Sequence, residues 1–240
     1  MTTAIEYEYL GLNEGSLTEY HTAWQHQRDV HAQVAAGSRA GTVIYVEHPP
    51  VYTAGRRTEP HERPQDGTPV VDVDRGGKIT YHGPGQLVGY PIVTLPGRVG
   101  VVDYVRRLEE ALIRLLADYG ISTGRVPDRT GVWLAAGAGR PERKIAAIGI
   151  RVSKRTTMHG FALNVSSHLD DFDKIVPCGI ADAGVTSVAA ELSWAPSLAE
   201  VGHDLEPYLD EYLAFEPFVF SPDLHDLTMP VAPIRYGLSI

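Results

Sequence analysis

The chain has 240 residues, which suffices for one domain with a modest appendage. Hydrophobic residues make up 43% and charged residues 21%, as in soluble proteins with a packed core, while the net charge of −9 argues against a nucleic-acid-binding protein. No apolar run approaches the length of a membrane span, and the N-terminus lacks the basic and apolar regions of a secretory signal. With a single cysteine, Cys178, we expect a cytoplasmic protein.

The first half of the chain predicts one helix followed by strands. Ser16 and Glu19 match a capping box, and the helix is expected to run from there to about Ala35 and to end at Gly37. Short apolar, β-branched runs then predict three strands, at 42–47, 69–73 and 87–95. A polar loop at 54–67 separates the first two.

The second half predicts two more helices and three more strands. Apolar residues recur at helical spacing from Val102 to Leu116, and Gly120 supplies the stop. A second capping box, Ser197 and Glu200, opens a helix that is expected to reach about residue 213. The β-like runs lie at 131–134, 145–152 and 159–165, with a Gly-rich turn at 135–143. Together the elements predict an α/β (α+β) domain with a mixed β-sheet flanked by helices.

Residues 75–91, RGGKITYHGPGQLVGYP, form the most informative segment. Five glycines and two prolines exclude an ordinary helix and allow the backbone to bend and to approach a ligand closely. Polar side chains that can hydrogen-bond lie between them, which predicts a ligand-binding loop. GPGQLVG at 83–89 misses the dinucleotide fingerprint by one position and the chain has no P-loop, so a phosphate cradle is not supported.

Four residues are candidates for chemistry. Cys178 lies between a proline and a glycine, and is either a small buried residue or a nucleophile that needs an activator. Lys144 begins an apolar strand and is either a solvated surface group or that activator, because an ammonium near a thiol lowers the thiol pKa. His82 and His159 are alternative general bases, or residues that shape loops. The spacing of these residues does not favour a zinc site.

The pattern R-G-G-x-x-T-[aromatic]-H-x-x-G-Q-x-x-x-Y-P is filled without a gap from Arg75 to Pro91 and resembles the signature of the lipoyl (octanoyl) transferase B family. Further segments resemble other motifs of that family: KIAAIGIRV from Lys144, HGFALNV at 159–165, and VPCGI at 176–180 followed by VTS at 185–187. The resemblance covers roughly residues 40–192. It implies a single acyltransferase domain at 1–216 with a Pro-containing tail at 217–240, and a fold like the catalytic domains of biotin and lipoate protein ligases.

The resemblance also implies an activity. An octanoyl group would move from octanoyl-acyl carrier protein to the target lysine of a lipoyl domain, through a thioester on Cys178 with Lys144 as its catalytic partner. This is the first step of protein lipoylation, and it needs no ATP because amide formation from a thioester runs downhill; no cofactor and no metal are implied. The implied acceptors are the lipoyl domains of 2-oxoacid dehydrogenase complexes and the glycine cleavage H protein, and a monomer is the default. The implied substrate-binding residues are Arg75, Gly76, Gly77, Lys78, Ile79, Thr80, Tyr81, His82, Ala147, Ile148, Gly149, Gly160, Phe161 and Ala162, with His159 and Asn164 in support.

Acyl carrier proteins and lipoyl domains are typically acidic, so a chain with a charge of −9 needs a local basic face to attract them. Two basic clusters are expected to flank the mouth of the active site: Arg56, Arg57 and Arg63, and Arg140, Arg143, Lys144, Arg151, Lys154 and Arg155. Three other functions remain open on the sequence. They are an ATP-dependent lipoate–protein ligase, a thiol hydrolase that releases octanoate, and a non-catalytic binding module.

Overall fold

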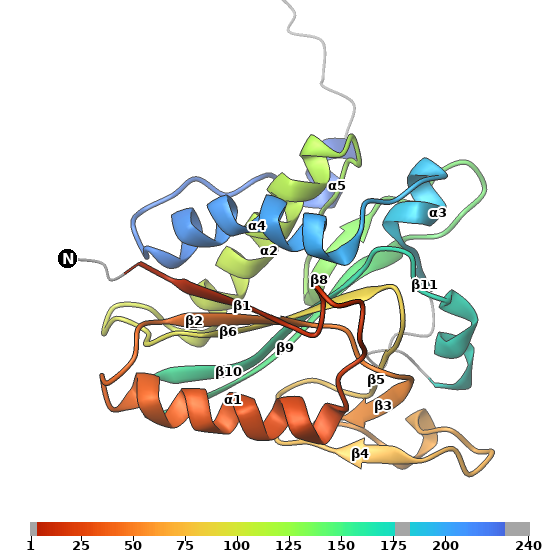
Figure 1. Cartoon of the computed structure of the whole chain (residues 1–240). Coiled ribbons are helices and arrows are strands. Elements are labelled where there is room, and N and C mark those ends of the chain that lie inside the picture. The colour runs from red at the N-terminus through yellow and green to blue at the C-terminus, as the bar shows by residue number, and fades with distance from the viewer. Residues whose placement is uncertain (1–3, 176–182, 229–240) are drawn as a thin grey trace, which may run out of the picture.

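A mixed β-sheet forms the centre of the computed structural model, which describes residues 4–175 and 183–228 (Figure 1). Its strand order within the described residues is β1-β2-β6-β10-β9-β8-β7, and β11 pairs with β9 off this path. The strands are β1 (Glu6–Leu10), β2 (Thr42–Val46), β6 (Gln86–Ile92), β7 (Gly124–Val126), β8 (Arg129–Leu134), β9 (Arg143–Ser153), β10 (Thr156–Asn164) and β11 (Gly184–Val185). Parallel pairs, β1 with β2 and β11 with β9, join otherwise antiparallel neighbours, so the predicted mixed sheet is confirmed.

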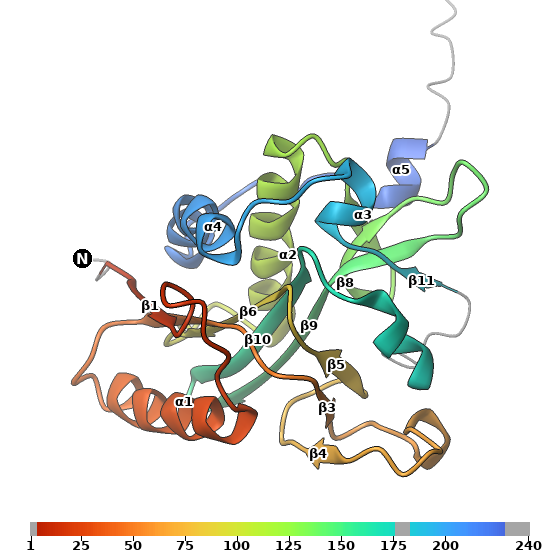
Figure 2. The same cartoon turned by 45° about the vertical axis from the view of Figure 1, so that its right-hand side comes forward.

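A small second sheet lies beside the end of the main sheet (Figure 2). It consists of β4 (Val70–Asp72), β3 (Val51–Ala54) and β5 (Thr80–His82), in that order. The glycine-rich segment contributes β5 to the small sheet and β6 to the large one, and therefore joins the two. Glycine is required at this junction because Gly85, between β5 and β6, has a φ of +81° that other residues rarely adopt.

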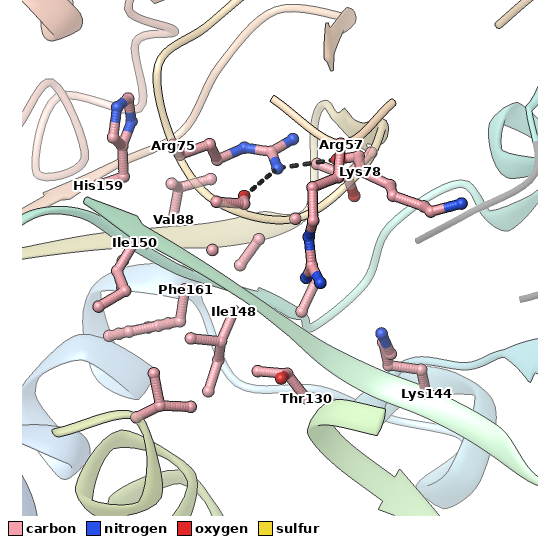
Figure 3. A pocket seen from close by; sticks show the side chains of 18 of the residues that line it. Arg57, Arg75, Lys78, Val88, Thr130, Lys144, Ile148, Ile150, His159 and Phe161 are labelled. Carbon is pink, nitrogen blue, oxygen red and sulfur yellow. Dashed lines mark hydrogen bonds between the residues drawn. The ribbon is translucent and has the colours of Figure 1, made fainter. Parts of the chain in front are cut away.

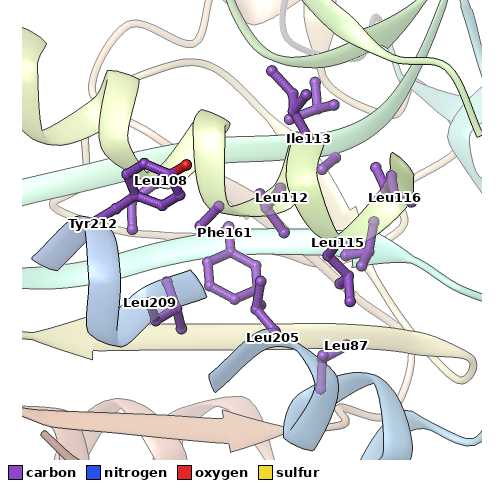
Figure 4. Packing of buried hydrophobic residues seen from close by; sticks show 14 of the residues in the cluster. Leu87, Leu108, Leu112, Ile113, Leu115, Leu116, Phe161, Leu205, Leu209 and Tyr212 are labelled. Atoms are coloured by element: carbon purple, nitrogen blue, oxygen red, sulfur yellow. The ribbon is translucent and has the colours of Figure 1, made fainter. Parts of the chain in front are cut away.

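Helices cover both faces of the main sheet. Helix α1 (Tyr20–Ala35) lies on one face, while α2 (Val101–Asp118) and α4 (Leu198–Leu213) lie on the other (Figure 1). Leu108 and Leu112 of α2 pack with Phe161 of β10 and with Leu205 and Leu209 of α4 to form the larger core (Figure 4). The short elements are η1 (Pro60–Glu62), η2 (Leu169–Lys174), α3 (Val188–Leu192) and α5 (Leu224–Thr228).

The three predicted helices are present, but only one predicted cap is. The Ser197 hydroxyl accepts from the Glu200 amide, and the Glu200 carboxylate accepts from the Ser197 amide, as the capping box requires. The capping box at Ser16 is wrong: Glu19 is the N-cap of α1 without a side-chain bond, and the Ser16 hydroxyl donates to the carbonyl of Gly11. The sequence analysis also missed β1, β3, β5, β7 and β11. All five are short and are held by neighbouring strands rather than by local propensity.

Part of the C-terminal tail packs on the domain. The guanidinium of Arg125 donates to the carbonyl of Ser221, and Leu224 is buried against Trp133 and Val126. Residues 229–240 lie outside the described part, and the domain boundary at 216 stays a prediction. Within the described ranges, no helix has both the length and the apolar character required to cross a bilayer.

Candidate active site

A pocket of about 380 Å³ lies where the glycine-rich segment crosses β9 and β10 (Figure 3). Its size is within the range of small-molecule sites. The predicted site residues that line it are Arg75, Gly76, Gly77, Lys78, Thr80, His82, Lys144, Ala147, Ile148, Gly149, His159, Gly160, Phe161 and Ala162.

The pocket exists because β8 and β9 separate after a short pairing. Their register ends with Val132 opposite Ala146, and the next amide of β8, at Gly131, donates to the buried Glu109 carboxylate (2.9 Å) instead of to β9. The following part of β9 is met by the glycine-rich segment, whose Gly76 amide donates to the carbonyl of Ile150 (2.8 Å). Lining residues consequently come from both faces of the sheet. Figure 3 shows Ile148 and Ile150 on one side of the β9 ribbon and Arg75 and His159 on the other.

A β-bulge directs Lys144 into this pocket. Trp133 pairs with Lys144 and Val132 with Ala146, so Ile145 is an extra residue in β9. Such an insertion reverses which face the preceding side chains occupy. Ile145 and Ala146 both belong to the core beneath α2, whereas Lys144 and Ala147 line the pocket. The Lys144 side chain is 7% exposed, and its ammonium lies 4.6 Å from the centroid of the Trp133 ring.

The segment that follows Cys178 is attached to the backbone of Lys144. Val185 of β11 pairs in parallel with Lys144, and the amide of Thr186 donates to the Lys144 carbonyl (2.9 Å). On the other side, Ile175 is buried next to the small sheet. Cys178 itself lies outside the described residues.

The cations of the glycine-rich segment hold the segment together. The Arg75 guanidinium donates to the carbonyls of Lys78 (2.8 Å) and Thr53 (2.7 Å), and it is only 7% exposed. The Lys78 ammonium forms an ion pair with the buried Glu62. Both side chains therefore stabilise the wall of the pocket through hydrogen bonds and an ion pair to other residues of the protein.

A hydrogen-bond chain connects His82 with the region around Lys144. The Gln86 side-chain amide donates to Asn164 (2.9 Å), which in turn donates to the carbonyl of Thr186 (3.0 Å). The Gln86 oxygen is then left as the acceptor for His82 Nδ1 (2.7 Å), and His82 Nε2 accepts from the Thr53 hydroxyl (3.3 Å). These contacts assign the proton of His82 to Nδ1.

His82 is neutral in this environment. Burial lowers its pKa from 6.5 to about 3, and the nearby His48 adds to the shift. Such a side chain is a poor proton acceptor at neutral pH, so the arrangement favours the loop-shaping alternative over the general-base one for His82.

His159 occupies a constrained position at the end of the pocket away from Lys144 (Figure 3). Its φ of +57° is unusual for a residue other than glycine. Its Nε2 lies 2.8 Å from the Asp74 carboxylate, which also pairs with Arg151. Burial lowers the pKa of His159, although Asp74 opposes the shift.

Of the predicted site residues that the structure describes, three do not line this pocket. Ile79 and Tyr81 point to the opposite side and pack with Tyr52 and Phe172, so the pocket gives no support for their predicted contact with substrate. Asn164 lines a much smaller neighbouring cavity together with Lys144 and Ala147.

Two of the glycines are explained by backbone contacts. A Cβ at Gly149 would lie 3.1 Å from the Arg75 side chain, and a Cβ at Gly160 would overlap the carbonyl of Gly89. Glycine at position 160 thus allows β6 to approach β10 closely.

The prediction that both basic clusters flank the mouth is supported for two of their residues. Arg57 and Lys144 line the pocket. Others are paired elsewhere in the protein: Arg140 and Arg143 with Glu191, Arg151 with Asp74, and Arg63 with Asp72. The sequence does not show these pairings because every partner is distant along the chain or in a different element.

Several pocket residues had no role in the sequence analysis. They are Tyr20, Val88, Val101, Val105, Asp128, Arg129, Thr130 and Ile150, while Tyr90 appeared only as part of the signature. Trp133, beneath the Lys144 ammonium, also gave no signal. These residues belong to α1, α2, β8 and other elements that are far apart in the sequence, and only the fold brings them together.

The matching family model is the lipoyl protein ligase A/B catalytic domain, which covers residues 19–209. The chain belongs to this family. A Cutibacterium acnes protein named octanoyltransferase is 58% identical over 229 residues, which cover 92% of this chain and 84% of that protein. A Mycolicibacterium paratuberculosis octanoyltransferase is 66% identical over 175 residues, covering 72% of this chain and 74% of the relative.

Solved structures show the same fold at low sequence identity. Lipoate-protein ligase A bound with ATP matches with a TM-score of 0.62 at 15% identity, covering 95% of this chain and 92% of that one. A bipartite lipoate protein ligase from Thermoplasma acidophilum matches with a TM-score of 0.61 at 16% identity, covering 93% and 90%. The expected likeness to lipoate-ligase catalytic domains is therefore confirmed.

Proposed function

We propose that this protein of the lipoyl protein ligase A/B family is an octanoyltransferase, which moves an octanoyl group from octanoyl-acyl carrier protein to the target lysine of a lipoyl domain. The observation that carries the proposal is the placement of Lys144: a bulge turns this buried lysine into the wall of a pocket, next to the strand that follows Cys178. The relatives named octanoyltransferase support the same activity.

Cys178 and Lys144 would share the chemistry in two acyl transfers. The Cys178 thiolate attacks the octanoyl thioester, the bond between the acyl carbon and the carrier's sulfur breaks, and Lys144 protonates the departing thiolate. The target amine then attacks the acyl-enzyme, Lys144 takes a proton from it, and Cys178 leaves as a thiolate. The products are an amide and the free carrier, and atoms balance without ATP.

The pocket would bind the acyl chain along β9. Small residues, Ala147, Gly149 and Ala162, line it on one face of the sheet, and Ile148 and Ile150 line it on the other. Seven methylene or methyl groups, at about 0.8 kcal/mol each, would contribute roughly 5–6 kcal/mol before ordering costs. This is enough to favour a medium chain over a short one.

Intact-protein mass spectrometry tests the proposal directly. After incubation with octanoyl-acyl carrier protein, the wild type should gain one octanoyl group in a hydroxylamine-sensitive thioester, and Cys178→Ser should not gain such a thioester. Addition of a lipoyl domain should then transfer the group without ATP. An ATP requirement would identify a ligase, release of free octanoate a hydrolase, and the absence of any adduct a binding module.

The acceptors would be lipoyl domains of 2-oxoacid dehydrogenase complexes and the glycine cleavage H protein. A monomeric state and a cytoplasmic location remain predictions from the sequence.

A further inference from the structure

We propose that the N-terminus of α2 and the β9–β10 turn form a docking surface for the acidic acyl carrier protein. We call this surface the α2 rim, and it consists of Arg98, Val101, Val102, Lys154 and Arg155. The inference rests on the proposed function and adds a place where one of the two protein substrates binds.

The α2 rim is continuous with the pocket. Val101 and Val105, on the first two turns of α2, line the pocket together with Ile148 and Ile150. Val101 is 50% exposed and Val102 is 73% exposed, in the first turn of a helix whose other apolar residues are mostly buried. Exposed aliphatic side chains beside a pocket opening are typical of a contact surface for a partner.

Three cations adjoin these valines. The Arg155 guanidinium donates to the carbonyls of Leu95 (2.9 Å) and Val99, and Arg98 donates to the carbonyl of Phe215 (2.8 Å). These bonds place the β9–β10 turn beside the loop that leads into α2. None of the carboxylates in the described ranges forms an ion pair with Arg98, Lys154 or Arg155, in contrast to the paired arginines at the other end of β9. Their positive charge therefore remains available to an acidic partner.

The turn holds its two cations in a conformation that their residue types disfavour. Lys154 has a φ of +50° and Arg155 a φ of +60°, at the two positions where hairpins usually carry Asn-Gly. Residues in disfavoured backbone conformations cluster at functional sites. Here the function would be the display of positive charge beside the pocket.

The distance to Lys144 favours the carrier over the lipoyl domain. Ile150, the lining residue of β9 nearest the β9–β10 turn, is six positions along the strand from Lys144, which corresponds to about 20 Å. A lysine side chain has five bonds of about 1.5 Å beyond Cα and reaches about 6 Å, so a lipoyl domain must dock close to Lys144. The phosphopantetheine arm of the carrier is much longer and can cross the pocket from the rim.

The test compares octanoyl-acyl carrier protein with octanoyl-pantetheine, a thioester that has no protein to dock. Lys154→Asn removes a charge while keeping a residue that tolerates positive φ, and Arg98→Gln removes a second charge. Arg114→Gln, about 20 Å further along α2, is the matched control with the same change in net charge. Thermal unfolding verifies that each variant folds.

We expect Lys154→Asn and Arg98→Gln each to lower kcat/KM for the octanoylated carrier about fivefold at low salt, with the difference lost at high salt. Their activity with octanoyl-pantetheine and their KM for the lipoyl domain should stay at the wild-type value. An unchanged value for the carrier, an equal loss with both thioesters, or a raised KM for the lipoyl domain would overturn the docking surface. A wild type that transfers octanoyl from neither thioester would instead overturn the proposed function.

Discussion

The ammonium of Lys144 lies 4.6 Å from the centroid of the buried Trp133 ring, and the two residues face each other across β8 and β9. A cation over an indole face gains about 1 kcal/mol. The ring therefore fixes the lysine head on the side of the pocket where the chemistry is proposed.

Replacement of Trp133 should reveal this contact. Because an aromatic face remains, Trp133→Phe should keep most of the activity, whereas Trp133→Leu should lower kcat/KM about fivefold, from the loss of about 1 kcal/mol. Both variants lose the bond from the indole N–H to the Arg129 carbonyl, so their comparison isolates the ring face. Equal activity of the two, per folded molecule, would contradict the contact.

Lys144→Met should lower kcat by about 10²- to 10⁴-fold, the usual range for the loss of a positioned proton-transfer group. Without the ammonium nearby, alkylation of Cys178 by iodoacetamide should require a higher pH. Lys174→Met is the matched control, since Lys174 is exposed and close to Cys178 in the sequence. An alkylation profile that does not differ between the two variants would argue against a partnership of Lys144 with Cys178.

Ala147→Leu should shorten the acyl slot. Ala147 lines the pocket two strand positions beyond the bulge at Ile145, and three added carbons there would displace two or three methylenes of the substrate. At about 0.8 kcal/mol per methylene, kcat/KM for octanoyl thioesters should fall about 30-fold. Butyryl thioesters should be affected far less, and an equal loss for both chains would place the acyl chain elsewhere.

His82 should contribute to acid sensitivity. Its pKa is 6.5 in the unfolded chain and about 3 when folded, so between these values only the unfolded chain is protonated at this residue. The stability that depends on neutral His82 is thus complete above pH 6.5 and falls as the pH decreases toward 3. In His82→Gln, the free energy of unfolding should fall about 1.4 kcal/mol per pH unit less steeply across this range.

Urea unfolding at several pH values measures this difference. His48, whose pKa burial lowers to about 4, is present in both proteins, and its contribution cancels in the comparison. Parallel curves for wild type and variant would show that His82 is not held neutral.

Local patterns in the sequence predicted much of the fold. The helical spacing from Val102 to Leu116 and the Ser197–Glu200 cap correspond to α2 and α4, because an apolar stripe and a capping box are properties of a few neighbouring residues. The Ser16 cap failed because a serine hydroxyl has several backbone acceptors within reach, and here the carbonyl of Gly11 is the one it uses. Strands β1 and β3 escaped detection since their partners are supplied by the tertiary structure.

For the site, the sequence by itself determined which residue types are present and in what order: a punctuated glycine-rich segment, a lysine at the start of an apolar strand, and a lone cysteine. Only the tertiary structure decided how they are used. The bulge at Ile145 turns Lys144 into the pocket, Glu109 separates β8 from β9 by taking the Gly131 amide, and carboxylates from other elements pair with Arg140, Arg143 and Arg151. These outcomes depend on contacts between residues far apart in the chain, and local spacing carries no information about them.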